Sequence, residues 1–280
     1  MDFLTEIMSL KRARLEQSKE KRGIEAMRSL AEEIRSNARP NALRAALGNG
    51  ERINVIAEFK RASPSKGVIR NEAEAASVAL RYEAGGAAAI SVLTEEDRFQ
   101  GSLDDLRSVR AAVQLPILRK DFIFDEYQLY ESAAAGADAL LLIVAALDDE
   151  RLTLLRRITE DELGMDALIE VHTKDEMQRA LDAGAKLIGV NNRDLHSFNV
   201  SLEVSEQLAQ DACAETLLVA ESGLSSADDL RRLRALGYRG FLIGETLMRA
   251  DAPEVALLEL IDEGEGKSRI QESEVRIQKG

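Results

Sequence analysis

The sequence predicts an α/β fold in which short apolar runs alternate with amphipathic segments, and three observations support it. Eight apolar runs of strand length recur between residues 54 and 243, and a segment with helical periodicity follows each of them. Several helical segments end at a glycine, as at Gly85 and Gly184. No G-x-G-x-x-G motif follows the first run, which argues against a doubly wound open sheet. Eight alternating units therefore predict a closed (β/α)8 TIM barrel.

An extra helical segment precedes the barrel. We expect one helix from about residue 3 to 33, then a break at 37–49 that holds a short helical piece at 42–47. The expected strands are 54–60, 88–93, 116–120, 139–143, 167–170, 187–191, 217–221 and 240–243. The expected barrel helices are 72–84, 103–112, 126–135, 148–162, 174–183, 204–212, 226–236 and 253–262. The prediction is one domain, with an N-terminal extension (1–50), a barrel (51–262) and a polar tail (263–280).

Composition excludes several classes of function. The 280 residues are 45% hydrophobic and 31% charged, which is ordinary for a globular domain. The net charge of −13 argues against binding to nucleic acid or to an anionic membrane. No apolar run approaches the ~20 residues that span a bilayer, and charged residues interrupt the N-terminus, so no signal peptide is expected. A single cysteine, Cys213, and two histidines argue against a disulfide and a zinc site. We expect no metal and a cytoplasmic location.

The stretch at residues 55–67 places charge inside an apolar strand. It reads V-I-A-E-F-K-R-A-S-P-S-K-G, and Ile56, Glu58 and Lys60 share one face because alternate residues of a strand do. A buried carboxylate and ammonium are costly unless they are paired or used. The residues alone allow either an ion pair at the end of a strand or part of an active site.

Other strands also end in polar groups, and the active site of such a barrel lies at the carboxyl ends of its strands. Lys120, Glu170 and Glu221 end the third, fifth and seventh strands, and Asn191 ends the sixth, with Arg193 two residues further on. Any one of these could be a solvated charge where a strand stops. Together with Glu58 and Lys60 they predict a ring of compensating charges that can supply acids and bases.

Small-residue turns follow the last two strands. They contain Ser222 and Gly223 after the seventh strand, and Gly244 and Glu245 after the eighth. Loops at these positions often hold a phosphate on backbone N–H groups. A carboxylate repels phosphate, so we expect the backbone of Glu245, not its side chain, to face the ligand. The alternative is that both glycines only permit tight turns. Ser63, in the first loop, could close over the same phosphate.

Remaining candidates have simpler explanations. Phe99 and Phe122 lie just beyond the second and third strands and could line an aromatic pocket or pack under a loop. We expect His172 and His196 to be loop residues and Cys213 to have no nucleophilic role. Ser102 is expected to cap the helix that follows it.

At these residues the chain closely resembles the indole-3-glycerol phosphate synthase family. Matching blocks run from about residue 55 to 248 and include every expected strand except 139–143. They are I-A-E-F-K-R-A-S-P-S-K-G, S-V-L-T-E-E-D-R-F-Q-G-S, P-I-L-R-K-D-F-I, L-I-E-V-H, G-V-N-N-R-D-L, V-A-E-S-G and F-L-I-G-E-T-L-M. The leading helix at 3–20 also matches the additional helical segment that precedes the barrel in this family.

The resemblance implies a reaction without a cofactor. The substrate would be 1-(2-carboxyphenylamino)-1-deoxyribulose 5-phosphate, and ring closure with loss of CO₂ and then water would give indole-3-glycerol phosphate for tryptophan biosynthesis. Lys120 would be the general acid for ring closure, a role that suits a lysine whose pKa is lowered by burial and neighbours. Glu170 would serve the dehydration, with Glu58 and Lys60 assisting.

The same resemblance implies how the substrate is held. Lys60 would bind its carboxylate, and Phe99 with Phe122 would form a wall beside its aryl ring. Asn191 and Arg193 would bind hydroxyl groups or support the charge ring, and Glu221 with Ser222 would complete the pocket. The phosphate would lie on Ser63, Gly223, Gly244 and Glu245.

Three other functions fit parts of the sequence. Phosphoribosylanthranilate isomerase is also a phosphate-binding barrel, but it is expected to use a Cys/Asp pair, and Cys213 does not end a strand. A Schiff-base aldolase would use Lys120 or Lys60 as its nucleophile. A non-catalytic sugar-phosphate binder should lack part of the charged rim. We expect a monomer or a weak homo-oligomer with a small anionic ligand.

Overall fold

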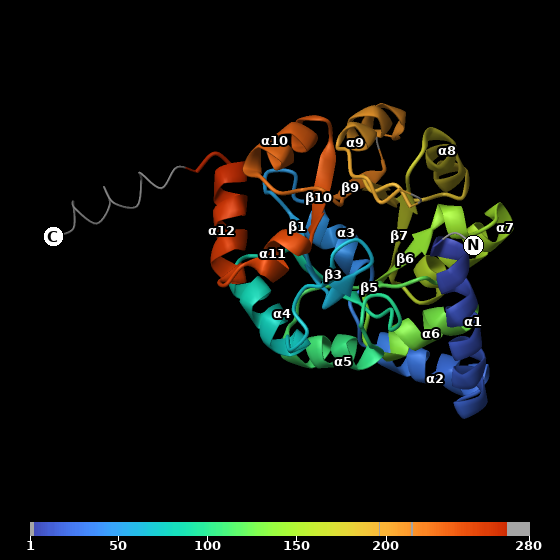
Figure 1. The fold of residues 1–280 in the computed structure, drawn as a ribbon. Helices are drawn as coiled ribbons and strands as arrows, with labels where there is room; N and C mark the ends of the chain where they lie inside the picture. Colours follow the sequence, from blue (N-terminus) through green and yellow to red (C-terminus); the bar gives the residue numbers. More distant parts are fainter. Residues whose placement is uncertain (1–2, 196, 214, 268–280) are drawn as a thin grey trace.

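The protein is a closed parallel barrel surrounded by helices (Figure 1). The computed structural model describes residues 3–195, 197–213 and 215–267. Within them the barrel strands follow the order β1-β10-β9-β8-β7-β6-β5-β4, and β1 pairs with both β10 and β4 to close the ring. The predicted barrel with a helical N-terminal extension is therefore confirmed. The barrel strands are β1 (Val55–Phe59), β4 (Ala89–Leu93), β5 (Ile117–Lys120), β6 (Ala139–Ile143), β7 (Asp166–Val171), β8 (Leu187–Asn191), β9 (Leu217–Glu221) and β10 (Tyr238–Ile243).

Helices cover the outside of the barrel and close its amino-terminal end. Alternate strand residues point outward and pack against the helices, and the others point inward, where Ile56, Leu118 and Leu168 are fully buried. The helices are α1 (Phe3–Lys21), α2 (Ile24–Arg35), α3 (Ala42–Leu47), α4 (Ala75–Ala84), α5 (Leu103–Ala112), α6 (Glu126–Ala134), α7 (Asp149–Arg157), α8 (Lys174–Asp182), α9 (Glu203–Leu208), α10 (Ala227–Ala235), α11 (Glu245–Arg249) and α12 (Pro253–Gly264).

Helix α3 plugs the amino-terminal end of the barrel. Leu43 and Leu47 are fully buried with the inward-facing strand residues. The Arg44 guanidinium lies 2.5 Å from the Asp166 carboxylate at the start of β7, and the Asn54 side-chain amide donates to the Leu47 carbonyl oxygen. With this end closed, the open mouth lies at the carboxyl ends of the strands.

The structure corrects the expected N-terminal helix and adds elements. The single helix expected over 3–33 is wrong: α1 and α2 are separate, and Gly23 between them is extended, with φ −60° and ψ 157°. Glycine has a high conformational cost in a helix, so the chain turns there. The hairpin of β2 (Ala62–Ser63) and β3 (Gly67–Val68) was not expected, nor was α11.

Several boundaries also differ from expectation. The segment expected as one helix over 148–162 changes to a π-helical turn, Ile158–Glu162, and α12 ends two residues beyond the expected 262. Ser102 accepts from the Asp105 N–H as the predicted cap of α5. Most of the expected polar tail, residues 268–280, lies outside the described part of the chain.

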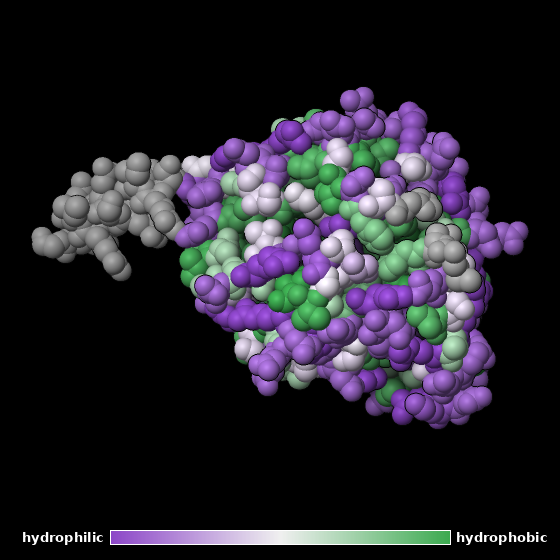
Figure 2. All heavy atoms as spheres, viewed as in Figure 1, coloured by the Kyte–Doolittle hydropathy of each residue, from purple (hydrophilic) through white to green (hydrophobic). Residues whose placement is uncertain are grey.

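Hydrophilic side chains cover most of the face shown in Figure 2, and hydrophobic groups appear among them as separate patches. This agrees with a chain in which acidic residues (50) outnumber basic ones (37). Among the described residues, no helix is both long and apolar enough to cross a membrane.

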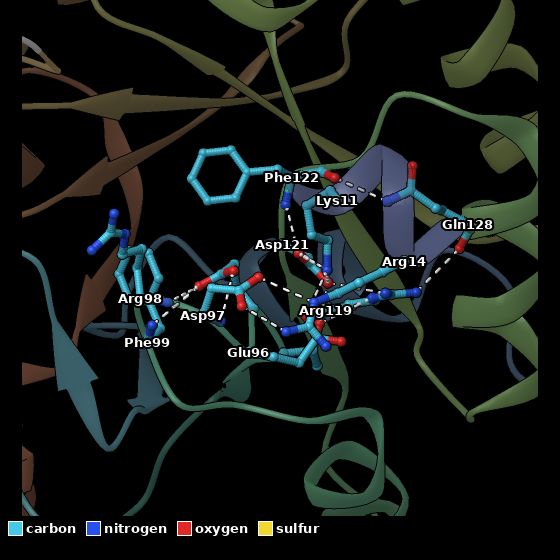
Figure 3. Close-up of polar contacts among 12 residues, drawn as sticks. Lys11, Arg14, Glu96, Asp97, Arg98, Phe99, Arg119, Asp121, Phe122 and Gln128 are labelled. Atoms are coloured by element: carbon cyan, nitrogen blue, oxygen red, sulfur yellow. Dashed lines mark hydrogen bonds and ion pairs between the residues drawn. The ribbon is translucent and has the colours of Figure 1, made fainter. Parts of the chain in front are cut away.

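Helix α1 is attached to the barrel by a buried charge network beside β5 (Figure 3). The Lys11 ammonium lies 2.8 Å from the Asp121 carboxylate, and both side chains are almost completely buried. Asp121 also accepts from Thr94 Oγ1 at 2.6 Å and from Arg119 Nη2 at 2.9 Å. Arg119 is paired in turn with Glu131 at 2.9 Å. Each buried charge therefore has an opposite partner, the condition under which burial is tolerated.

Loss of the Asp121 charge should destabilise the fold in a pH-dependent way. Burial alone would raise the Asp121 pKa, but Lys11 and Arg119 lower it from 3.8 to about 2. A carboxylate with a depressed folded-state pKa stabilises fully above its unfolded pKa, and its contribution is lost as the pH falls from about 4 toward 2. We expect Asp121→Asn to lower the free energy of unfolding by at least ~2 kcal/mol at pH 7 and by about half as much at pH 3, as measured by urea unfolding.

The matched control is Asp104→Asn. Asp104 forms an exposed pair with Arg107, and such pairs contribute about 0–1 kcal/mol. A loss for Asp121→Asn that is equal at pH 7 and pH 3 would contradict this origin of the stability.

Candidate active site

The open mouth holds a cavity of about 700 Å³ at the carboxyl ends of the strands. Thirteen of the fourteen residues predicted for the site line it, and Glu221, which is fully buried beneath it, is the exception. Segments that are far apart in the sequence thus converge at one place. The predicted residues that line the cavity are Glu58, Lys60, Ser63, Phe99, Lys120, Phe122, Glu170, Asn191, Arg193, Ser222, Gly223, Gly244 and Glu245.

Lys120 lies at the centre of the mouth between two carboxylates. It ends β5, and its ammonium forms an ion pair with Glu221 at the end of β9 and lies 3.6 Å from Glu170 on β7. The side chain of Lys120 is 16% exposed, whereas Glu170 and Glu221 are almost completely buried. The Glu221 carboxylate fits because the neighbouring strand carries Gly189: a Cβ atom there would overlap the Glu221 Oε1 oxygen.

The electrostatics differ from the sequence-based expectation for Lys120. Burial alone would lower the Lys120 pKa, but the carboxylates of Glu221, Glu170 and Glu58 raise it above its ordinary value. The expectation of a lowered pKa is therefore wrong, and Lys120 is held as a stable ammonium. The Glu221 pKa is raised to about 7, chiefly by burial and by Glu170, although Lys120 opposes the shift.

A second ion pair lies beside the first. The Lys60 ammonium is 2.5 Å from Oε1 of Glu58, which ends the inward face of β1. Burial alone would raise the Glu58 pKa, but Lys60, Lys120 and Arg193 lower it, so Glu58 is ionised. Gly244 gives this carboxylate room, because a Cβ atom at 244 would overlap Glu58 Oε1. Gly244 is thus required for packing as well as for the turn.

The turn after β9 has a backbone shape that favours ligand contact. Ser222 and Gly223 both have positive φ, 64° and 79°. A serine in this region is uncommon, and such strain is concentrated at functional sites. Asn192, which the sequence did not single out, fixes the turn by donating its side-chain amide to the carbonyl oxygens of Glu221 and Ser222.

Cations near this turn come from the segments that follow the neighbouring strands β8, β10 and β1. Arg193 Nη1 lies 3.2 Å from Ser65 Oγ in the hairpin after β1. The Glu245 carboxylate lies 3.1 Å from Arg249 Nε and 4.0 Å from Lys66. Arg249 and Lys66 compensate the negative charge of the Glu245 carboxylate, which would otherwise repel a phosphate. Arg249 lies on α11 and Lys66 lies in the hairpin of β2 and β3, two elements that the sequence pattern did not predict.

Aromatic rings line the side of the cavity next to α1. The ring centroids of Phe99 and Phe122 are 6.5 Å apart, and Phe3 lies edge-on to Phe122 at 6.4 Å. Phe3 also meets Phe198, at 5.2 Å. Phe3 and Phe198 were missed because their positions depend on how α1 and the loop after β8 fold over the mouth. A local sequence pattern gives no signal for such a contact.

The structure places His172 in a loop, as expected, and leaves the prediction for Cys213 untested. His172 follows the end of β7 in a loop, and Cys213 is exposed and free. His196 lies outside the described residues. His172 is nevertheless buried against Glu170, a contact that its loop position did not predict.

A closed parallel barrel with a charged mouth and glycine turns after its last two strands is typical of (β/α)8 enzymes that act on phosphorylated substrates. A family model described as indole-3-glycerol phosphate synthase matches residues 4–260. The chain belongs to this family. An indole-3-glycerol phosphate synthase from Carboxydothermus hydrogenoformans is 49% identical over 259 residues, 91% of this chain and 98% of the relative.

Another relative supports this assignment, and a solved structure shares the fold. A protein of the same name from Leifsonia xyli is 53% identical over 206 residues, 74% of this chain and 79% of that protein. Among solved structures, 3-hexulose-6-phosphate synthase from Salmonella typhimurium has a TM-score of 0.60 at 10% identity, and the match covers 76% of this chain and all of that one. Such low identity shows the fold alone. Family membership identifies a decarboxylating lyase of tryptophan biosynthesis and confirms the activity that the resemblance implied.

Substitution of Gly189 should inactivate the site with little effect on the rest of the barrel. In Gly189→Ala the new methyl group would push the Glu221 carboxylate away from Lys120. We expect kcat to fall by roughly 10- to 100-fold, measured by formation of the indole product.

Gly23→Ala is the matched control, because no atom lies within 4 Å of a Cβ placed at Gly23. It should keep near-normal turnover. Normal turnover in Gly189→Ala would show that the position of Glu221 does not matter for the reaction.

Proposed function

We propose that the cavity binds 1-(2-carboxyphenylamino)-1-deoxyribulose 5-phosphate and converts it to indole-3-glycerol phosphate, CO₂ and water. The observation that carries this proposal is the convergence of Lys120, Glu170 and Glu58 at one mouth that also holds an aromatic wall and the Ser222–Gly223 turn. The substrate has an anionic aryl group at one end and a phosphate at the other. The cavity offers a matching surface for each.

Lys120 acts in this proposal as the general acid of ring closure. Its ammonium is held in the mouth by Glu221 and Glu170, and its raised pKa keeps it protonated in the free enzyme. In ring closure the substrate carbonyl oxygen takes the proton from Nζ and becomes a hydroxyl group. The carbonyl carbon bonds to the ring carbon that carries the carboxylate. Loss of CO₂ then returns the bonding electrons to the ring.

Glu170 is assigned to the dehydration. As a carboxylic acid it protonates the departing hydroxyl group, which leaves as water, and the substrate loses one proton to restore the aromatic indole. Glu58 and Lys60 assist, and their 2.5 Å contact places an acceptor and a donor side by side. Dehydration gives one proton to the departing hydroxyl group and takes another from the substrate. Coupled carboxylates at one mouth can supply the first proton and accept the second.

The two ends of the substrate have separate binding groups. Its phosphate lies on the backbone of Gly223 and Gly244 with Ser63 and the Glu245 backbone, and the side chain of Glu245 is kept away by Arg249 and Lys66. Its carboxylate is bound by Lys60. Its aryl ring rests against Phe99 and Phe122.

The remaining site residues complete the pocket. Asn191 and Arg193 contact hydroxyl groups of the substrate, and the Asn191 side-chain oxygen already accepts from the Arg193 N–H. Glu221 acts by holding the Lys120 ammonium in place, and Ser222 acts by shaping the turn after β9. We further propose a cytoplasmic enzyme, monomeric or weakly self-associating, because this substrate is an intracellular metabolite and the one cysteine is free.

The direct test is to incubate the protein with the proposed substrate and to follow indole absorbance and fluorescence. Product formation supports the assignment, and its absence at high enzyme concentration contradicts it. Borohydride added during turnover tests the aldolase alternative, because a covalent Lys120 or Lys60 adduct would be trapped only by a Schiff-base mechanism.

Removal of the Lys120 ammonium should affect turnover far more than binding. General acid catalysis typically contributes 10²–10⁴-fold, so Lys120→Ala should lose roughly that factor in kcat, with a much smaller change in KM. Lys174→Ala is the control, because Lys174 is exposed and pairs only at the surface with Asp211. Circular dichroism checks that each variant is folded. A near-normal kcat would remove Lys120 from the mechanism.

Arg193 should contribute mainly to binding. Arg193→Ala removes a cation beside Ser65 and the hairpin, so we expect KM to rise by roughly 10-fold with a smaller loss in kcat. Initial rates over a range of substrate concentrations separate the two constants. An unchanged KM would exclude Arg193 from substrate binding.

A further inference from the structure

His172 is a buried histidine beside the carboxylate assigned to dehydration. It follows β7 directly, and its side chain is 11% exposed. Its Nε2 atom lies 3.4 Å from Oε1 of Glu170, and no hydrogen-bond partner for Nε2 is found among the described residues. The other ring nitrogen, Nδ1, lies 3.2 Å from Oε2 of Glu176 on α8. The imidazole thus bridges a carboxylate in the mouth and a carboxylate nearer the surface.

The arrangement limits where protons can lie. Glu176 also accepts the His172 backbone N–H at 2.7 Å, and its pKa is lowered, because His172 and Arg179 overcome the effect of burial. An ionised Glu176 requires a proton on Nδ1. If Nε2 then carried only a lone pair, it would face the lone pairs of an ionised Glu170 and repel them. A proton carried by either Nε2 or Oε1 would remove this repulsion across their 3.4 Å contact.

We propose that His172 is a positioning residue that holds this proton for Glu170. When the proton is on Nε2, the imidazolium orients Glu170 as an ionised base. When it moves to Oε1, His172 is neutral and Glu170 is the carboxylic acid that dehydration needs. The transfer is balanced: the Nε2–H bond breaks, an Oε1–H bond forms, and the total charge of the pair stays at zero. This inference rests on the role proposed above for Glu170.

The surrounding charges are compatible with an imidazolium. Burial alone would lower the His172 pKa, but Glu176, Glu170 and Glu221 raise it above its ordinary value. Lys120 faces Glu170 from the other side at 3.6 Å, and Arg179 lies on the same helix as Glu176. Three carboxylates and one ammonium therefore act on the ring from β7, α8, β9 and β5. Their sum favours a positive charge on His172.

The first test measures the His172 pKa by NMR in protein labelled at histidine. The chain has two histidines, so His172→Asn assigns the signals. Coupled groups shift each other's pKa reciprocally. We expect Glu170→Gln and Glu176→Gln each to lower the His172 pKa by on the order of one unit. Asp175→Asn, which removes an exposed carboxylate at the start of the same helix, should shift it by much less.

The second test uses the pH dependence of turnover. In His172→Asn the imidazole no longer holds the proton that dehydration needs, so the basic limb of the kcat profile should move to lower pH. We expect kcat at neutral pH to fall by roughly 10-fold, with KM changed less than about threefold. A purely structural role for the ring would lower activity without moving the limb.

The two proposals fail in different ways. An unchanged His172 pKa in Glu170→Gln, or an unmoved basic limb in His172→Asn, would overturn the role of His172 even if the wild-type enzyme is fully active. A wild-type protein that forms no indole product would overturn the proposed function. The NMR measurement needs no turnover and remains informative in that case.

Discussion

The ammonium of Lys120 between the carboxylates of Glu170 and Glu221 is the interaction on which the site depends. Each group alone would be costly at this depth, because burial penalises an unpaired charge. The three come from β5, β7 and β9, so they meet only when the barrel is closed and in register. Formation of the fold and assembly of the charged centre are therefore one event. Gly189 is part of the same constraint, since any side chain there would occupy the position of Glu221.

Strand alternation lets β5 serve two charge systems at once. Lys120 points into the mouth, whereas Arg119 before it pairs with Asp121 in the network that holds Lys11 and α1. Asp121 follows β5 directly and also borders the cavity. The same helix brings Phe3 to the aromatic wall. Attachment of α1 and placement of Lys120 thus share two adjacent peptide units. A disturbance of the network around Asp121 would be expected to reach Lys120 through the backbone.

The barrel and most of its mouth could be predicted from the sequence because both depend on local periodicity. Eight apolar runs specify the strands, and the rule that active sites lie at their carboxyl ends brings Glu58, Lys120 and Glu170 together. Contacts that depend on non-local docking could not be predicted. Phe3 reaches the cavity because α1 docks on the barrel, in part through Lys11 and Asp121, which are 110 residues apart in sequence. The pKa of Lys120 was mispredicted for the same reason, since its direction depends on how many carboxylates surround it.

The charges that face one another in the mouth explain why its carboxylates should differ in pKa. Glu58, Glu170 and Glu221 face Lys60, Lys120 and Arg193, so the six groups sum to zero when all are ionised. The proposed substrate adds a phosphate and a carboxylate, and their negative charge raises the pKa of any nearby acid. Glu221, whose pKa is already near 7, is the group that takes up a proton most easily. Its protonation would loosen its hold on Lys120 when the substrate arrives. The Lys120 ammonium would then be free to turn from a carboxylate of the protein toward the substrate carbonyl oxygen, as the proposed general-acid role requires.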